Sequence, residues 1–144
     1  MAATLADDMS GQHQAIDARL ARTSAHLDGG DTAAAARDAA ELAAALRHHI
    51  RLEEEHLFPA YARAPAADLE LLAAMRNQHA EIAALVQELE ETLAAGNRGP
   101  ALAAKAALHA ALGTHDDEEE ALCAALDRTL DGPGRAQLVA LLRR

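Results

Sequence analysis

Residues 69–93, LELLAAMRNQHAEIAALVQELEETL, contain the pattern that decides the fold. Their apolar side chains recur every three or four positions, the spacing that aligns residues along one face of an α-helix. This stripe consists of Leu69, Leu72, Met75, Ile82, Val86, Leu89 and Leu93. His79 falls in the same register, three positions before Ile82. The segment therefore predicts a long amphipathic helix with an imidazole on its buried face.

Helix-breaking residues separate this segment from other amphipathic stretches. Glycine, alone or with proline, interrupts the chain at residues 29–30, 96–100 and 131–134, and these residues close or start helices. We expect further helices over about residues 5–27, from Asp31 or Thr32 to a point before Pro65, over about 101–130, and over about 135–142. Short connections favour antiparallel neighbours. We therefore predict an all-α, up-down-up-down antiparallel four-helix bundle over residues 1–130, followed by a turn and a short fifth, capping helix over residues 131–144.

The composition agrees with a helical domain. Ala and Leu dominate the 144 residues, β-branched residues are scarce, and Phe58 and Tyr61 are the only aromatic side chains. Ala and Leu favour helices, and a chain of this length forms one ordinary domain. The single cysteine, Cys123, excludes an internal disulfide and a cysteine-based zinc finger. Histidines and carboxylates must therefore perform any metal chemistry.

Charge and hydropathy restrict the partners. The net charge of −10 argues against a nucleic-acid surface, which needs clustered Lys and Arg. No stretch is long and apolar enough for a membrane span, and the N-terminus lacks the pattern of a signal peptide. We expect a cytoplasmic protein that is a monomer or a weak homo-oligomer and that binds neither nucleic acid nor membrane.

One spacing of potential metal ligands occurs twice. In each set, a histidine is followed after 36 positions by a second histidine, with a glutamate four positions further on. The two sets are His13, His49 and Glu53, and His79, His115 and Glu119. Every member of the second set lies 66 positions after its counterpart. Imidazole and carboxylate together suit iron, zinc or manganese, so the repeat predicts metal inside the bundle, with two ions related by a pseudo-twofold axis as one arrangement.

The helical period places these side chains on the buried faces. Residues four apart are displaced by only about 40° around a helix, so His49 and Glu53 share a face, and the second pair does too. Burying two ionised glutamates without compensation costs several kcal/mol each, about as much as a small domain's whole stability can absorb. A bound cation removes that penalty, and no basic residue stands in the apolar stripes to do so instead.

These residues resemble a known family. The segment HIRLEEEHLFP, residues 49–59, looks like the second-helix signature of hemerythrin-like proteins, the HHE cation-binding domains, and HDDEEE, residues 115–120, looks like its fourth-helix counterpart. The resemblance covers about residues 5–126. It implies a four-helix bundle with two non-haem iron ions, bridged by Glu53 and Glu119 and completed by four terminal histidines, His13, His49, His79 and His115. Similar proteins bind oxygen, sense iron, oxygen or nitric oxide, or handle peroxide and nitrosative stress.

One departure from the family pattern bears on function. Oxygen-carrying hemerythrins have a second histidine one turn from the third-helix histidine, whereas here Met75 and Ala83 stand one turn from His79. The resulting site is more symmetric and richer in carboxylate. We therefore expect a sensor or a stress-handling protein rather than a bulk oxygen carrier, with oxygen, peroxide or nitric oxide as its small ligand. Whether it is an enzyme acting on peroxide or nitric oxide stays open.

Several alternatives also stay open at this level. His56 lies one turn beyond Glu53 and is either a ligand or a partly exposed residue, and Glu118 and Glu120 are lesser candidates than Glu119. Zinc accepts the same ligands, so a redox-silent module that binds or buffers zinc or iron is the main alternative function. A domain that binds a partner through an interface that responds to metal occupancy is a third possible function. Cys123 is expected to be a small core residue.

Overall fold

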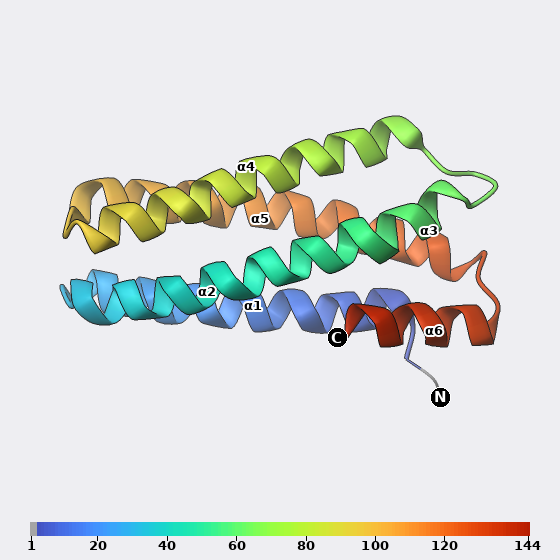
Figure 1. Ribbon diagram of the computed structural model, residues 1–144, viewed down its shortest axis with the longest axis horizontal. Helices are drawn as coiled ribbons and strands as arrows, with labels where there is room; N and C mark the ends of the chain where they lie inside the picture. The colour runs from blue at the N-terminus through green and yellow to red at the C-terminus, as the bar shows by residue number, and fades with distance from the viewer. Residues whose placement is uncertain (1–2) are drawn as a thin grey trace.

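The computed structural model describes residues 3–144, and within that range every regular element is helical (Figure 1). The prediction of an all-α fold is confirmed. The elements are α1 (Leu5–Asp28), α2 (Thr32–Leu52), a π-helical turn η1 (Glu53–Leu57), α3 (Phe58–Ala62), α4 (Leu69–Ala94), α5 (Arg98–Asp127) and α6 (Gly132–Leu142). None of these helices is long and apolar enough to cross a membrane.

Side-chain caps explain where most helices begin. The hydroxyl of Thr4 accepts a hydrogen bond from the backbone N–H of Asp7 at the start of α1. The carboxylates of Asp31, Asp68 and Asp131 accept backbone N–H groups in the same way at α2, α4 and α6. Such caps satisfy N–H groups that the first turn of a helix leaves free.

The helix ends differ in places from the sequence prediction. The fifth predicted helix, α6, begins at Gly132 rather than near residue 135, because Asp131 caps it and Pro133 is tolerated in a first turn. Helix α5 begins at Arg98 and ends at Asp127, not at residues 101 and 130. Gly30 has a φ of 81°, and this left-handed conformation closes the α1–α2 turn as expected for glycine.

The second long helical run ends at Ala62, before Pro65 as predicted, and it passes through Pro59. It continues from α2 through the π-helical turn η1 into α3, and the backbone N–H of Phe58 bonds to the carbonyl of Glu53. Pro59 follows directly, and proline within an α-helix removes a hydrogen bond and clashes with the carbonyl four residues earlier. The wider turn accommodates that proline. It also begins at Glu53, and π-helical turns are frequent at functional sites.

Four long helical segments lie side by side (Figure 1). Helix α1 packs on α2 and α5, and α4 packs on the same two helices. The α1–α2 and α4–α5 connections lie at one end of the molecule, whereas the α3–α4 and α5–α6 connections lie at the other (Figure 1). Helix α6 packs against η1 and α1.

The buried interior consists of two apolar layers with a polar layer between them. One layer, near the α1–α2 turn, contains Leu20, Leu46, Val86 and Leu108. The other, near α6, contains Met9, Leu57, Met75 and Leu122. The buried polar and charged side chains between them, apart from Thr23 further along α1, are His13, His49, Glu53, His79, His115 and Glu119. The six residues of the repeated spacing therefore form one layer across the bundle.

Candidate metal centre

The six side chains come from four helical segments and meet in two clusters. Each cluster contains two histidines and both glutamates, and in each the nearest nitrogen and oxygen atoms all lie within 4.8 Å of one another. The first cluster is His13, His49, Glu53 and Glu119, and the second is His79, His115, Glu53 and Glu119. All six residues are buried. Both clusters have the composition and compactness needed to hold a metal ion.

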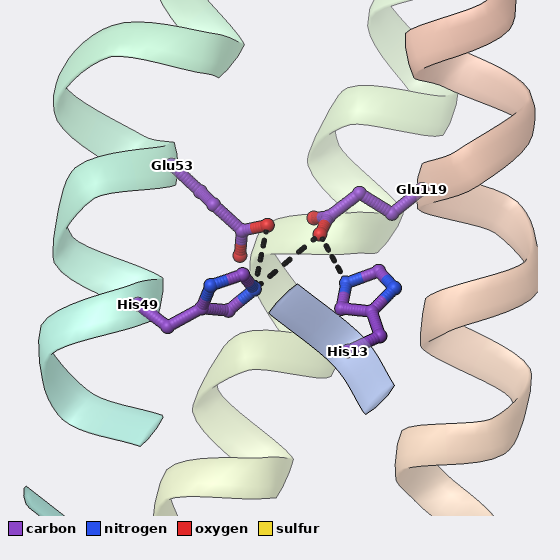
Figure 2. Close-up of side chains that lie close together, drawn as sticks. All are labelled: His13, His49, Glu53 and Glu119. Carbon is purple, nitrogen blue, oxygen red and sulfur yellow. Dashed lines mark hydrogen bonds and ion pairs between the residues drawn. The ribbon is translucent and has the colours of Figure 1, made fainter. Parts of the chain in front are cut away.

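The two carboxylates divide their oxygens between the clusters. Glu53 Oε2 lies 3.0 Å from His49 Nε2, and Glu53 Oε1 lies 3.2 Å from His79 Nε2. Likewise, Glu119 Oε1 lies 3.1 Å from His13 Nε2, and Glu119 Oε2 lies 3.1 Å from His115 Nε2. Figure 2 shows the first cluster, in which both carboxylates and both imidazoles point towards a common centre. Each glutamate therefore faces both clusters with a different oxygen.

Several inward-facing atoms lack a hydrogen-bond partner. These buried atoms are both oxygens of Glu53, Oε2 of Glu119 and Nε2 of His49. In addition, Nε2 of His79 lies only 3.1 Å from Nε2 of His115. Buried polar groups without partners cost about 1–3 kcal/mol each, and more when charged. A cation in each cluster would satisfy all of these atoms, so the donor set fits a pair of metal ions.

The outward nitrogen of every imidazole contacts a side-chain oxygen. Nδ1 of His49 lies 3.0 Å from Gln12 Oε1, and Nδ1 of His115 lies 2.7 Å from Gln78 Oε1. The other two contacts join Nδ1 of His79 to Glu54 Oε1 at 3.0 Å, and Nδ1 of His13 to Glu120 Oε1 at 3.4 Å. A carboxylate oxygen only accepts, so Nδ1 of His79 donates and its Nε2 lone pair faces the centre.

The glutamine amides are themselves held in one orientation. The Nε2 group of Gln78 donates to Glu118 Oε2 at 2.7 Å, and that of Gln12 donates to Asp8 Oδ2 at 2.8 Å. The amide oxygens must then face the histidines, which donate from Nδ1. These contacts therefore present the Nε2 lone pairs of His49 and His115 to the centre, as outer-shell partners of metal-binding histidines do.

The outer contacts repeat with the same offset of 66 positions as the inner residues. Gln78 lies 66 positions after Gln12, and Glu120 lies 66 after Glu54. Sequence analysis named Glu120 only as a lesser candidate ligand and did not single out Gln12, Glu54 or Gln78 as site residues. The signal that could have found them is the offset itself, since each adjoins a residue of the inner set.

The residues left open by the sequence take different places. Glu118 contacts Gln78, and Glu120 contacts the outer nitrogen of His13, so neither belongs to the two clusters. His56 lies outside both clusters, with Nε2 4.0 Å from Glu55. Cys123 is buried in the apolar layer near α6. The ring of Phe58 stacks on the imidazole of His79 with centroids 5.0 Å apart.

The environment shifts the pKa values of both glutamates. Burial, reinforced by the nearby Glu119 carboxylate, raises the pKa of Glu53 well above its ordinary range. Burial also acts to raise the pKa of Glu119, but the nearby side chains of Glu53, His115, His13 and His49 outweigh it and hold that pKa well below the ordinary range. In the metal-free pair, Glu119 therefore ionises at a lower pH than Glu53.

The histidines of the first cluster shift in opposite directions. Burial lowers the pKa of His49. Burial acts in the same sense on His13, but its contacts with Glu119 and Asp116 prevail and the pKa is raised. Asp116 lies with its Oδ1 atom 3.4 Å from Nε2 of His13, and burial raises its pKa to about 6. Metal binding must displace protons from such groups, so affinity should fall at low pH.

A surface cavity of ≈ 370 Å³ leads towards His49, the most exposed of the six residues at 9%. Its lining includes Gln12, His48, Leu142 and Arg143 as well as His49. The cavity lies between the bundle and the end of α6, and His49 is the one residue of the two clusters in its lining.

Fold and site together define a helical bundle with a buried, carboxylate-sharing pair of candidate metal sites. The model of the hemerythrin HHE cation-binding domain matches residues 4–126, so the chain belongs to the hemerythrin HHE cation-binding domain family. Comparison with curated proteins and with solved structures gave no match. The family prediction is confirmed, and the match extends over all six residues of the two clusters.

Proposed function

We propose that this protein holds two iron ions, bridged by Glu53 and Glu119, in an up-down-up-down antiparallel bundle. His13 and His49 are the terminal ligands of one ion, and His79 and His115 are those of the other. The observation that carries the proposal is the division of the carboxylate oxygens, since each glutamate faces one histidine pair with each oxygen. The family membership supports the same assignment.

The residues around the clusters have distinct tasks in this proposal. The glutamates neutralise the positive charge of the ions, and the glutamines and outer glutamates fix the imidazole orientation. Apolar residues on both sides exclude water and lower the local dielectric constant. When bound, the iron pair supplies redox chemistry and open positions for a small ligand.

The ligand we propose is oxygen, peroxide or nitric oxide, in a sensor or a stress-handling protein rather than a bulk carrier. Four histidines and two glutamates leave coordination positions free. The position one turn before His79 is occupied by the fully buried Met75, not by a fifth nitrogen ligand. The cavity beside His49 offers such small molecules a route of approach.

Metal analysis combined with spectroscopy tests this proposal. Aerobic iron loading of the purified full chain should give about two iron ions per chain and a visible absorption band, whereas a His49→Ala, Glu53→Ala variant should lack both. Anaerobic addition of oxygen, peroxide and nitric oxide to the ferrous protein then identifies the ligand by its spectral change. Less than about one iron per chain, or an unchanged variant, would sink the proposal.

A redox-silent zinc protein is the second candidate. Each cluster offers two imidazole nitrogens and two carboxylate oxygens, and zinc accepts both kinds of ligand and is usually four-coordinate in structural sites. A zinc-loaded protein is colourless under both oxidising and reducing conditions. Purification without added metal, followed by elemental analysis and an absorption spectrum, separates the two candidates.

A further inference from the structure

A third carboxylate contacts a histidine of the first cluster. Oδ1 of Asp116 lies 3.4 Å from Nε2 of His13, the same nitrogen that lies 3.1 Å from Glu119 Oε1. Asp116 precedes Glu119 by three positions on α5, so the two side chains share one face of the helix. Its side chain is only 15% exposed. Within residues 3–144, His13 is the one basic side chain within 4.0 Å of that carboxylate.

The second cluster has no counterpart of this carboxylate. The position 66 residues before Asp116 is Ile50, which packs against the apolar layer near the α1–α2 turn. The six inner residues and their four outer partners all have a counterpart 66 positions away. At Ile50 and Asp116 the two halves of the chain differ. A third carboxylate therefore lies against a histidine of the first cluster, and the corresponding position in the other half of the chain carries none.

We propose that Asp116 is a ligand of the metal ion held by His13 and His49, so that the two metal sites are unequal. This inference rests on the proposed function and adds one anionic oxygen to one site. The first site then offers five side-chain ligands and the second offers four. The first ion is bound more tightly, and the second retains more open positions for an exogenous ligand.

A purely electrostatic role for Asp116 makes a different prediction. A negative charge near both clusters would favour both ions to similar extents, because the ions share two bridging glutamates. A ligand strengthens only the ion that it touches. A loss of metal affinity at one site only therefore indicates a ligand, whereas a similar loss at both sites indicates an electrostatic role.

The test is a metal titration of the full chain carrying Asp116→Asn. Anaerobic ferrous iron and zinc are used as separate probes, each in competition with a chelator of known affinity. The matched control is Asp117→Asn, which removes the same charge from the exposed neighbouring position. Circular dichroism confirms that each variant retains its helices. We expect two resolved affinities for the wild type and for the control, and the tighter one to weaken about tenfold or more in Asp116→Asn.

Single-site backgrounds assign the affected ion. In the His79→Ala background, which leaves the first cluster whole, Asp116→Asn should lower the affinity for the remaining ion. In His13→Ala, which leaves the second cluster whole, Asp116→Asn should change affinity by less than about threefold. If these backgrounds do not fold, the titration in the wild-type background decides alone. If the affinities for both ions fall equally, or if neither falls, Asp116 is not a ligand of the first ion. The di-iron proposal is unaffected by that result. A wild type that binds fewer than two ions defeats both.

Discussion

Gln78 and His115 form the shortest of the four contacts that orient the imidazoles. The amide oxygen of Gln78 accepts from Nδ1 of His115 at 2.7 Å, while its amide nitrogen donates to Glu118 at 2.7 Å. This contact joins α4 to α5 and determines which nitrogen of His115 faces the interior. Its counterpart, Gln12 and His49, joins α1 to α2 in the same way. Each glutamine thus acts on the histidine of a neighbouring helix.

Replacing Gln78 by Leu should weaken metal binding about 10- to 100-fold, because the imidazole of His115 loses the acceptor that fixes its tautomer. The measurement is a chelator competition with zinc. Gln87→Leu, on the exposed face of the same helix, is the control and should bind as the wild type does. Equal affinities for the two variants would contradict an orienting role for Gln78.

Glu53→Gln should stabilise the metal-free protein and at the same time abolish paired metal binding. The Glu53 oxygens are buried without partners, and a neutral amide can donate to the Glu119 carboxylate. We expect a gain of about 1–3 kcal/mol in the free energy of unfolding at pH 7. Urea denaturation with and without metal measures both effects. Glu55→Gln, at an exposed position, should change neither.

The advantage of Glu53→Gln should grow with pH. Burial raises the folded-state pKa of Glu53 above its ordinary value of 4.5. Such a group stabilises the fold below about pH 4.5, and this contribution is lost as pH rises through the folded-state pKa. The amide does not titrate, so the difference in unfolding free energy should widen as the pH rises above about 4.5 towards the folded-state pKa of Glu53. A difference that narrows over this range would contradict the raised pKa.

Removing metal should lower the thermal stability of the wild type. An ion that binds only the folded chain adds about 2.7 kcal/mol at a free concentration 100-fold above its Kd. For a domain of this size that corresponds to a rise in Tm of roughly 5–10 °C, which a chelator should reverse. Differential scanning calorimetry gives the comparison. A His49→Ala, Glu53→Ala variant should show a much smaller shift, and an equal shift would place the bound metal elsewhere.

Phe58→Leu should destabilise the protein by about 1–2 kcal/mol. The variant keeps an apolar side chain but loses the face that stacks on His79, with the two rings only 11° from parallel. It also loses the contact of the Arg76 guanidinium, whose carbon lies 5.6 Å from the ring centroid. Urea denaturation measures the loss, and Arg76→Gln, which removes the cation and leaves the stack, should cost less. A cost as large for Arg76→Gln would mean that the cation, and not the stack, carries the effect.

Most of the inner site was predictable because it depends on periodicity within single helices. His49 and Glu53 share a face at four residues apart wherever their helix lies, and His79 had to face inward because Ile82 and Val86 do. The choice of Glu119 over Glu118 and Glu120 followed from the offset, and Glu119 is the member of that run found in both clusters. The π-helical turn at Glu53 was not predictable in the same way, since the sequence indicated one continuous helix that ends before Pro65.

The sequence by itself determined the helices, their buried faces and the inward position of six potential ligands, because those properties follow from the 3.6-residue period of one helix. Only the tertiary structure decided which side chains meet across helices. Gln12 reaches His49, Asp116 reaches His13, and Phe58 covers His79 because of the rotation and axial shift of each helix against its neighbours. No local pattern encodes that shift. It is set by the packing of the whole interior.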